Sequence, residues 1–156
     1  MIKKLLASVA GVIIGNVIEW NFHKRVLHGL GKNKKSIWNF HWYKHHKKCR
    51  KSMLDTDYEM TWQNIVKTPE FITLSAASTL LLLAAPKAPY FIAGLVGYGA
   101  AYYGIHMKSH LDNAWAKKWV PWHMRHHQLG NQEHSFNVVF PLTDYVMGTT
   151  YRTNNY

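Results

Sequence analysis

Three long apolar stretches dominate the chain, running from Leu5 to Trp20, from Phe71 to Ala85 and from Tyr90 to Ile105. The first is interrupted only by small or weakly polar residues until Asn16 and Glu19, and the other two carry no charge. Each is slightly shorter than the roughly 20 residues that cross a ~30 Å hydrocarbon layer, but one further helical turn closes the gap. The pattern predicts an all-α integral membrane helical bundle with about three to four membrane-embedded helices.

The segment Pro86-Lys87-Ala88-Pro89 separates the second and third stretches. Proline lacks the backbone N–H that a helix interior requires, so this segment predicts a turn between two helices that form a hairpin. Small residues at four-residue spacing should then allow close helix contact in lipid: Ala93, Gly97 and Ala101, and Ala100 with Gly104.

The basic N-terminus followed by an apolar run resembles a secretory signal peptide. No small-x-small cleavage site follows, and the run leads directly to the first histidines, so we expect a retained membrane helix. A length of 156 residues fits one domain, 1–156. Cys49 is the only cysteine, which excludes an intrachain disulfide.

The distribution of positive charge predicts an orientation. Of 19 Lys and Arg residues, only Lys3, Lys4 and Lys87 fall on one side of the predicted helices, and the others share the opposite side with every histidine. Cytoplasmic loops carry the Lys/Arg excess, so the histidines should form a cap that faces the cytoplasm. The basic run from Lys44 to Lys51 either sets this topology or grips anionic headgroups. A net charge of +11 combined with long apolar stretches argues against a nucleic-acid partner.

The candidate chemistry lies in eleven histidines, ten of which fall into four clusters. Histidine is the commonest metal ligand, and ten imidazoles exceed the four ligands of one structural zinc site, so the count indicates two metals. Imidazole also suits copper, iron and nickel, which leaves the metal open. The clustered histidines are His23 and His28; His41, His45 and His46; His106 and His110; and His123, His126 and His127.

Helical spacing places several of these side chains on common faces. His41 and His45, and His106 and His110, are four residues apart, and His123 is three and four residues from the next doublet. The members of the two doublets, His45-His46 and His126-His127, diverge by about 100°, as expected if each doublet contacts both metals. His23 and His28 differ by about 140° on an ideal helix, so they require a helix end or a position between two metals.

These motifs resemble those of the integral-membrane fatty acid hydroxylase/sterol desaturase superfamily. The match begins at Glu19-Trp-Asn-Phe-His23-Lys-Arg-Val-Leu-His28 and continues through His41-Trp-Tyr-Lys-His45-His46 and His106-Met-Lys-Ser-His110. It ends with His123-Met-Arg-His126-His127 and the tail from Phe136 to Thr149, which contains Pro-Leu-Thr-Asp144. One departure is the absence of the proline that often follows the second box.

The resemblance implies a fatty acid hydroxylase-like enzyme that oxidises a lipid C–H bond with O₂ and two iron ions, for which zinc can substitute in a purified sample. Electrons would come from a separate donor of ferredoxin, cytochrome b5 or reductase type. The ten clustered histidines would be the metal ligands, and no separate catalytic side chain is implied. Glu19 and Asp144 are candidates to orient imidazoles, with interfacial charge and helix capping as their alternatives. The lone His134 is a further ligand, a residue that orients a ligand, or a surface residue.

Two other functions fit the same residues. A carotenoid hydroxylase is similar in length, in its four histidine boxes and in the opening from His23 to Gly29. A membrane metal-binding or transport protein would use the histidines without catalysis. The lipid substrate, the carbon attacked and the choice between hydroxylation and desaturation stay open, because these enzymes share the same boxes.

Overall fold

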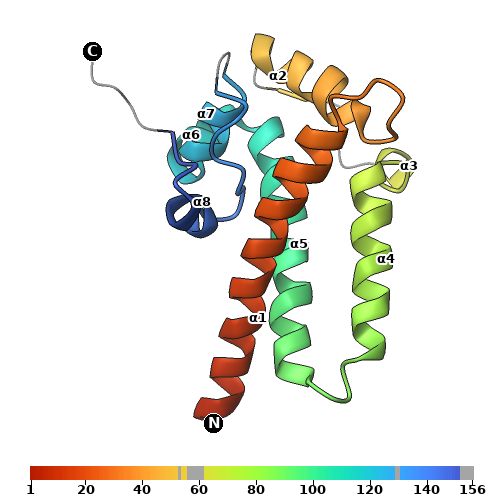
Figure 1. Ribbon diagram of the computed structural model, residues 1–156, viewed down its shortest axis with the longest axis vertical. Helices are drawn as coiled ribbons and strands as arrows, with labels where there is room; N and C mark the ends of the chain where they lie inside the picture. The colour runs from red at the N-terminus through yellow and green to blue at the C-terminus, as the bar shows by residue number, and fades with distance from the viewer. Residues whose placement is uncertain (53, 56–61, 129–130, 152–156) are drawn as a thin grey trace.

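The computed structural model describes residues 1–52, 54–55, 62–128 and 131–151, and every regular element in these ranges is a helix (Figure 1). The all-α expectation is therefore confirmed. In chain order the elements are α1 (Ile2–Asn21), η1 (Phe22–Leu30), η2 (His41–His45), α2 (His46–Ser52), α3 (Trp62–Ile65), α4 (Pro69–Leu83), α5 (Pro89–Leu111), α6 (Asn113–Trp119), α7 (Pro121–His126) and α8 (Leu142–Met147).

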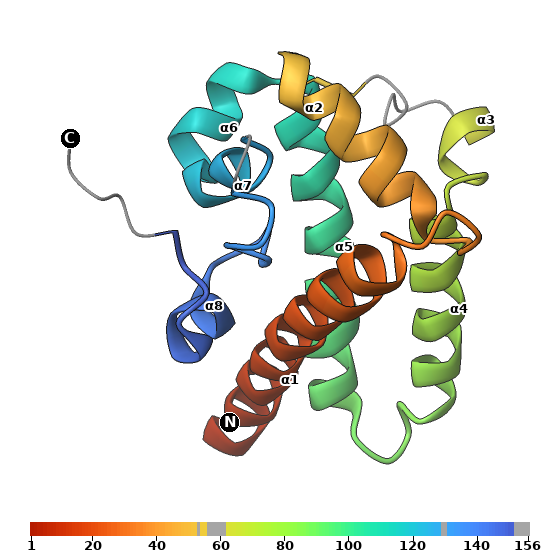
Figure 2. The same ribbon diagram turned by 45° about the horizontal axis from the view of Figure 1, so that its top comes forward.

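The two longest helices, α1 and α5, pack along each other and form the axis of the molecule (Figures 1 and 2). Glycines let their backbones touch: a Cβ atom added at Gly11 would lie 2.2 Å from the Phe91 carbonyl oxygen, and one at Gly94 would lie 2.2 Å from that of Ser8. A Cβ atom added at Gly97 or Gly104 would have no neighbouring atom within 4 Å. Of the stripe expected to allow helix contact, Ala93, Gly97, Ala100 and Gly104 are exposed and Ala101 is half-buried, so the close approach of α1 and α5 is made at Gly11 and Gly94 instead.

The predicted hairpin between α4 and α5 is confirmed. Pro69 starts α4, and the Thr68 side chain caps it by accepting a hydrogen bond from the Phe71 N–H. The helix ends at Leu83, before the two prolines, and Pro89 occupies the first turn of α5. The resulting turn lies at the same end of the molecule as the N-terminus (Figure 1), which places Lys87 near the end that carries Lys3 and Lys4.

The expected number of membrane helices is only partly met. By length and composition, one described helix can cross a membrane: the continuous helix Ile2–Leu30, formed by α1 and η1. A shorter apolar helix runs from Phe71 to Leu83. The Gly and Tyr residues of α5 and the histidines at its end lower its hydropathy, so three to four spans are not confirmed.

Most short elements gather at the end of the molecule opposite the hairpin turn. There η2 and α2 lie across the ends of α1 and α5, and α6 and α7 lie to the other side, whereas α8 lies lower, beside α1 (Figures 1 and 2). A small apolar core of Ala116, Val120 and Met124, packed with Trp115 and Trp122, joins α6 to α7. Ile105 of α5 also packs against this core, which fastens α6 and α7 to the long helix.

The contact between α1 and α5 predicts opposite effects for two identical substitutions. Gly11→Ala should lower the unfolding temperature of the detergent-solubilised protein, because overpacking against a backbone costs about 1–3 kcal/mol. Gly104→Ala on the open face of α5 should leave the temperature unchanged or raise it, since alanine exceeds glycine in helix propensity by up to about 1 kcal/mol. A thermal melt of both variants checks this, and equal melting temperatures would contradict the close approach.

Candidate metal centre

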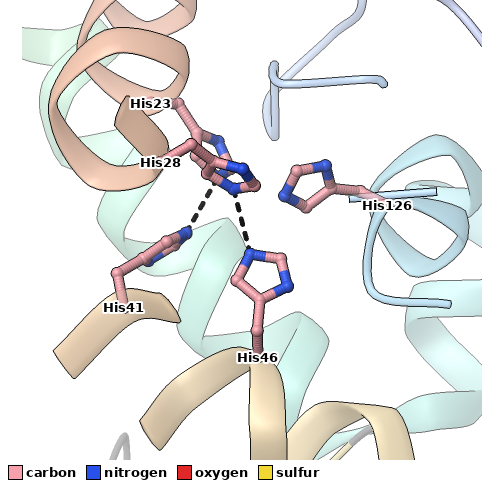
Figure 3. A group of neighbouring side chains, drawn as sticks. All are labelled: His23, His28, His41, His46 and His126. Carbon is pink, nitrogen blue, oxygen red and sulfur yellow. Dashed lines mark hydrogen bonds between the residues drawn. The ribbon is translucent and has the colours of Figure 1, made fainter. Parts of the chain in front are cut away.

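The structure brings ten histidines together at this end of the bundle, in two adjacent groups. Every one of their side chains is at most 2% exposed. Within each group the potential ligand atoms lie within 4.8 Å of one another. Cluster 1 consists of His23, His28, His41, His46 and His126, and is drawn in Figure 3. Cluster 2 consists of His45, His106, His110 and His127, and His123 joins it through short contacts to His110 and His127.

Two π-helical segments explain how histidines five residues apart face the same cluster. The i→i+5 hydrogen bonds of a π-helix place residues five apart one turn above each other. His23 and His28 lie in η1, and both contribute to cluster 1. His41 is the first residue of η2, and His46 is the residue directly after the end of η2. These two histidines also share cluster 1. The rings of His41 and His45 lie 5.1 Å apart, so both face the same region, as their spacing predicts, but they fall in different clusters.

Both histidine doublets divide between the clusters, as their divergence predicts. His46 and His126 contribute to cluster 1, whereas His45 and His127 contribute to cluster 2. The α-helical spacing of His106 and His110 holds in α5, and both face cluster 2. Each doublet thus ties the two clusters together through one peptide unit, so neither group can move far without the other.

The distances between ring nitrogens have the size that ligands of one metal ion require. His23 Nε2 lies 3.0 Å from His41 Nε2, and the same 3.0 Å separates the Nε2 atoms of His28 and His46 (dashed in Figure 3). In cluster 2, His123 Nε2 lies 3.0 Å from His110 Nε2 and 3.3 Å from His127 Nε2. Two nitrogens bound about 2.1 Å from one metal at right angles lie roughly 3.0 Å apart.

Hydrogen bonds at the outer nitrogens determine which ring nitrogen faces inward. His23 Nδ1 lies 2.5 Å from the Phe136 carbonyl oxygen, and His126 Nδ1 lies 2.6 Å from the His134 carbonyl oxygen. A carbonyl only accepts, so both Nδ1 atoms carry the proton, and the Nε2 atoms present lone pairs to cluster 1. His126 Nε2 is buried and has no hydrogen-bond partner among the described residues. The donor set therefore fits a cation.

Burial keeps most of these rings neutral. It lowers the pKa of His41, His46, His123 and His127 well below 6.5, and neighbouring imidazoles lower it further. Neutral imidazole is the form that binds metal. At His45, burial also acts to lower the pKa, but the Cys49 sulfur and the Asp55 carboxylate outweigh it and raise the pKa above its usual range. A metal bound at cluster 2 would displace the additional proton that this raised pKa keeps on the His45 ring.

Glu19 and Asp144 act on the site through the backbone of the C-terminal segment. Glu19 accepts hydrogen bonds from the Val138 N–H (2.6 Å) and the Asn137 side chain (3.0 Å). Asp144 accepts from the N–H groups of Phe136 (2.9 Å) and Asn137 (2.7 Å). These bonds hold the Phe136 carbonyl against His23. Their hydrogen bonds reach no imidazole, so an orienting role for either residue is indirect.

His134 does not join either cluster. Its side chain is exposed and its ring lies 6.4 Å from that of Tyr151, so the reading of His134 as a further ligand is wrong. The residue contributes its backbone carbonyl, which accepts from His126. Spacing cannot foresee this, because a carbonyl is common to every residue type.

Sequence analysis also missed two carboxylates and one thiol that lie against the clustered histidines. Asp55 is buried, and its Oδ2 lies 2.7 Å from His45 Nδ1. Cys49 Sγ lies 3.4 Å from His110 Nδ1, and Glu133 Oε1 lies 3.7 Å from His28 Nδ1. Position gives a partial signal for Cys49, which follows His45 by one helical turn, and none for Asp55, which lies beyond the end of α2.

The chain as a whole matches one known protein family. The sequence profile of the family described as fatty acid hydroxylase matches residues 8–149, which is nearly the whole chain and includes all ten clustered histidines. The chain belongs to the fatty acid hydroxylase family. No curated protein and no solved structure matches it. Membership in this membrane-associated family implies a metal-dependent oxidoreductase of the oxygenase type, which agrees with two buried histidine clusters.

In this fatty acid hydroxylase fold, the contact between Asp55 and His45 predicts a selective effect on metal retention. Asp55→Asn removes the carboxylate that orients His45 and raises its basicity, and loss of such a partner typically costs about 10–100-fold in metal affinity. We expect the variant to lose metal from cluster 2 at lower chelator concentration while cluster 1 stays loaded. Elemental analysis after chelator dialysis measures this.

Asp112→Asn is the matched control for Asp55→Asn. Asp112 follows His110 by two residues, but its side chain pairs with Lys108 at 2.7 Å and accepts a hydrogen bond from the Trp115 N–H, not from an imidazole. The Asp112→Asn variant should therefore retain metal as well as the parent protein does. Identical chelator curves for both aspartate variants would show that Asp55 does not support a ligand.

Proposed function

We propose that this protein is a membrane-bound, di-iron, O₂-dependent enzyme that hydroxylates a C–H bond of a fatty-acyl or related lipid. The observation that carries the proposal is the pair of adjacent, buried histidine clusters joined by two histidine doublets. One metal would be held by His23, His28, His41, His46 and His126. The other would be held by His45, His106, His110 and His127, with His123 beside them.

Iron is proposed because of the reaction rather than the ligands. Oxidation of an unactivated C–H bond requires an oxidant made from O₂, chemistry that metals carry and side chains do not. The overall change is R–H + O₂ + 2e⁻ + 2H⁺ → R–OH + H₂O. Two irons bound in the clusters would supply the redox chemistry of this reaction. Zinc could occupy the same nitrogens in a purified sample but would not support it.

The residues of this chain orient the imidazole ligands and exclude bulk water from them. Hydrogen bonds to the Phe136 and His134 carbonyls hold His23 and His126 with their Nε2 lone pairs inward. The buried Asp55 carboxylate accepts the Nδ1 proton of His45 and orients that ring. Complete burial of the histidines excludes bulk water, which protects a strong oxidant from side reactions.

A cavity beside the clusters supports a lipid substrate. It has a volume of about 220 Å³, lies between α1, α4 and α5, and has mostly apolar walls that include Leu74 and Gly99. Phe22 and Tyr102 also line it. Phe22 precedes His23, and the Tyr102 ring lies 5.4 Å from that of His106. A hydrocarbon chain in this cavity would therefore end next to residues of both clusters.

The same proposal includes the setting of the enzyme. We propose that it is an integral membrane protein, with the hairpin end in the bilayer and the histidine clusters at the cytoplasmic face, as the excess of Lys and Arg at that end favours. The substrate would enter from the bilayer. A separate electron donor of ferredoxin, cytochrome b5 or reductase type would supply the two electrons.

A matched pair of histidine substitutions tests the proposed centre. His126→Ala removes an inward-facing nitrogen and should lower product formation by at least roughly 100-fold, more than loss of an outer partner costs. His134→Ala removes an exposed ring but keeps the carbonyl that orients His126, so it should retain activity. Lipid and pigment profiles of a host that makes β-carotene, measured by mass spectrometry, report the product. Metal analysis of the purified protein should find close to two irons per chain.

Other outcomes of this experiment favour the competing functions. Hydroxylated carotenoid with unchanged acyl chains would identify a carotenoid hydroxylase, which the opening from His23 to Gly29 resembles. A single labile zinc or copper, together with no O₂ consumption, would identify a metal-binding protein without catalysis. Full activity of His126→Ala would contradict the ligand assignment.

The cavity predicts a second matched pair. A Cβ atom at Gly99 would lie 2.9 Å from Leu74 Cδ1, so Gly99→Leu should fill the space between α4 and α5. We expect activity on long acyl chains to fall by roughly tenfold or more, since misfit in an apolar pocket typically costs 10–200-fold, while the metal content stays unchanged. Gly97→Leu, where no atom lies within 4 Å, is the control. Equal activity of both variants would show that the substrate does not use this cavity.

A further inference from the structure

On the exposed side of the helix formed by η2 and α2, every charged residue is a cation. Its buried side consists of His41, His45, His46 and Cys49, which face the clusters, and its exposed residues include Lys44, Lys47 and Lys51. From Trp20 to Leu54 the sequence contains ten Lys or Arg residues and no Asp or Glu. A solvated helix face usually mixes acidic and basic residues, whereas this segment has basic residues alone.

The preceding loop extends the same surface. Lys32 Nζ lies 4.8 Å from the centre of the Trp42 ring, and Lys34 Nζ lies 5.8 Å from that of Tyr43. We call the exposed residues Lys32, Lys34, Lys44, Lys47 and Lys51 the cationic face. Lys32 pairs with Glu133 at 2.6 Å, but no carboxylate of the described residues pairs with the other four. Their charge is thus available to a partner.

The cationic face lies close to cluster 1. The ring of Trp42, which is partly exposed beneath Lys32, lies 5.1 Å from the ring of His28 and 5.6 Å from that of His46. A single side chain therefore separates this surface from two residues of the cluster. In Figures 1 and 2, η2 and α2 lie across the ends of α1 and α5. Because their buried side faces the clusters, the cationic face points away from the long apolar helices.

We propose that the cationic face is the docking surface for an acidic one-electron carrier protein, of the iron–sulfur or haem class. This inference rests on the proposed function, because the hydroxylation consumes two electrons that no residue of the chain supplies. Complementary charge steers such an encounter and raises the association rate. A protein partner accounts for the direction of the face better than lipid headgroups do, since the lysines point away from the helices that would enter the bilayer.

The test uses the iron-loaded enzyme in two sets of nanodiscs, one of neutral phosphatidylcholine and one that also contains phosphatidylserine, with an acyl lipid as substrate. The variant Lys44→Glu/Lys47→Glu/Lys51→Glu reverses the exposed charge of α2 and η2, and Lys117→Glu/Lys118→Glu reverses two exposed charges of α6 as a control. Each protein is reduced by dithionite, by a two-iron, two-sulfur ferredoxin, or by soluble cytochrome b5. Product per minute is measured against carrier concentration and salt.

The expected result is a loss that depends on the carrier. With at least one protein carrier, charge reversal on α2 and η2 should lower the second-order rate roughly tenfold to a hundredfold and weaken its salt dependence. The control variant should behave like the parent protein. With dithionite, all three proteins should form product equally, since a small reductant requires no docking.

Each other outcome has a defined meaning. Equal rates with the carriers for the parent and the reversed protein overturn the inference, as does product with dithionite but with neither carrier. A loss with dithionite as well shows that the lysines support the fold. A loss confined to nanodiscs that contain phosphatidylserine, with every reductant, assigns the face to headgroups instead. No product from the parent protein with any reductant contradicts the proposed function itself.

Discussion

The convergence of uncharged imidazole lone pairs in a volume buried from bulk solvent is the constraint on which the rest of the structure depends. A buried acceptor is costly unless a donor or a cation shares it. Here the outer nitrogens of His23 and His126 are fixed by backbone carbonyls, so their inner nitrogens can only accept. A cation resolves this arrangement at once. The helices, the π-helical turns and the C-terminal segment all hold rings around the two positions where such cations fit.

A second, purely structural polar network lies just below the clusters and joins α1, α5 and the C-terminal segment. Asn16 donates to Tyr98 and accepts from Thr143, and Asn137 donates to the Asn16 carbonyl oxygen (2.9 Å). Tyr98 also donates to Glu19. Networks of this kind rigidify a structure when every member is satisfied. Because the network includes neighbours of Phe136, it sets the position of the carbonyl on which His23 depends.

The parts of the fold that follow from local patterning were predictable. The proline-bounded turn between α4 and α5 and the division of both doublets follow from proline chemistry and helical angles. The glycines show the limit: Gly97 and Gly104 have the right spacing for helix contact, yet Gly11 and Gly94 make it, because spacing does not tell which face meets a neighbour. The π-helical turns escape prediction for a related reason. The demand that His23 and His28 share a cluster is a tertiary constraint, and it overrides the α-helical period.

The order of the histidines along the chain means that neither cluster is complete until α7 has been synthesised. Cluster 1 takes four of its residues from the first third of the chain, but its fifth, His126, comes from α7. Cluster 2 likewise begins with His45 and ends with His127. The carbonyl that orients His23 comes later still, at Phe136. A chain that ends before α7 would therefore expose histidine-rich segments without a finished cluster, and each cluster gains its full set of imidazoles only after His126 or His127 has been added.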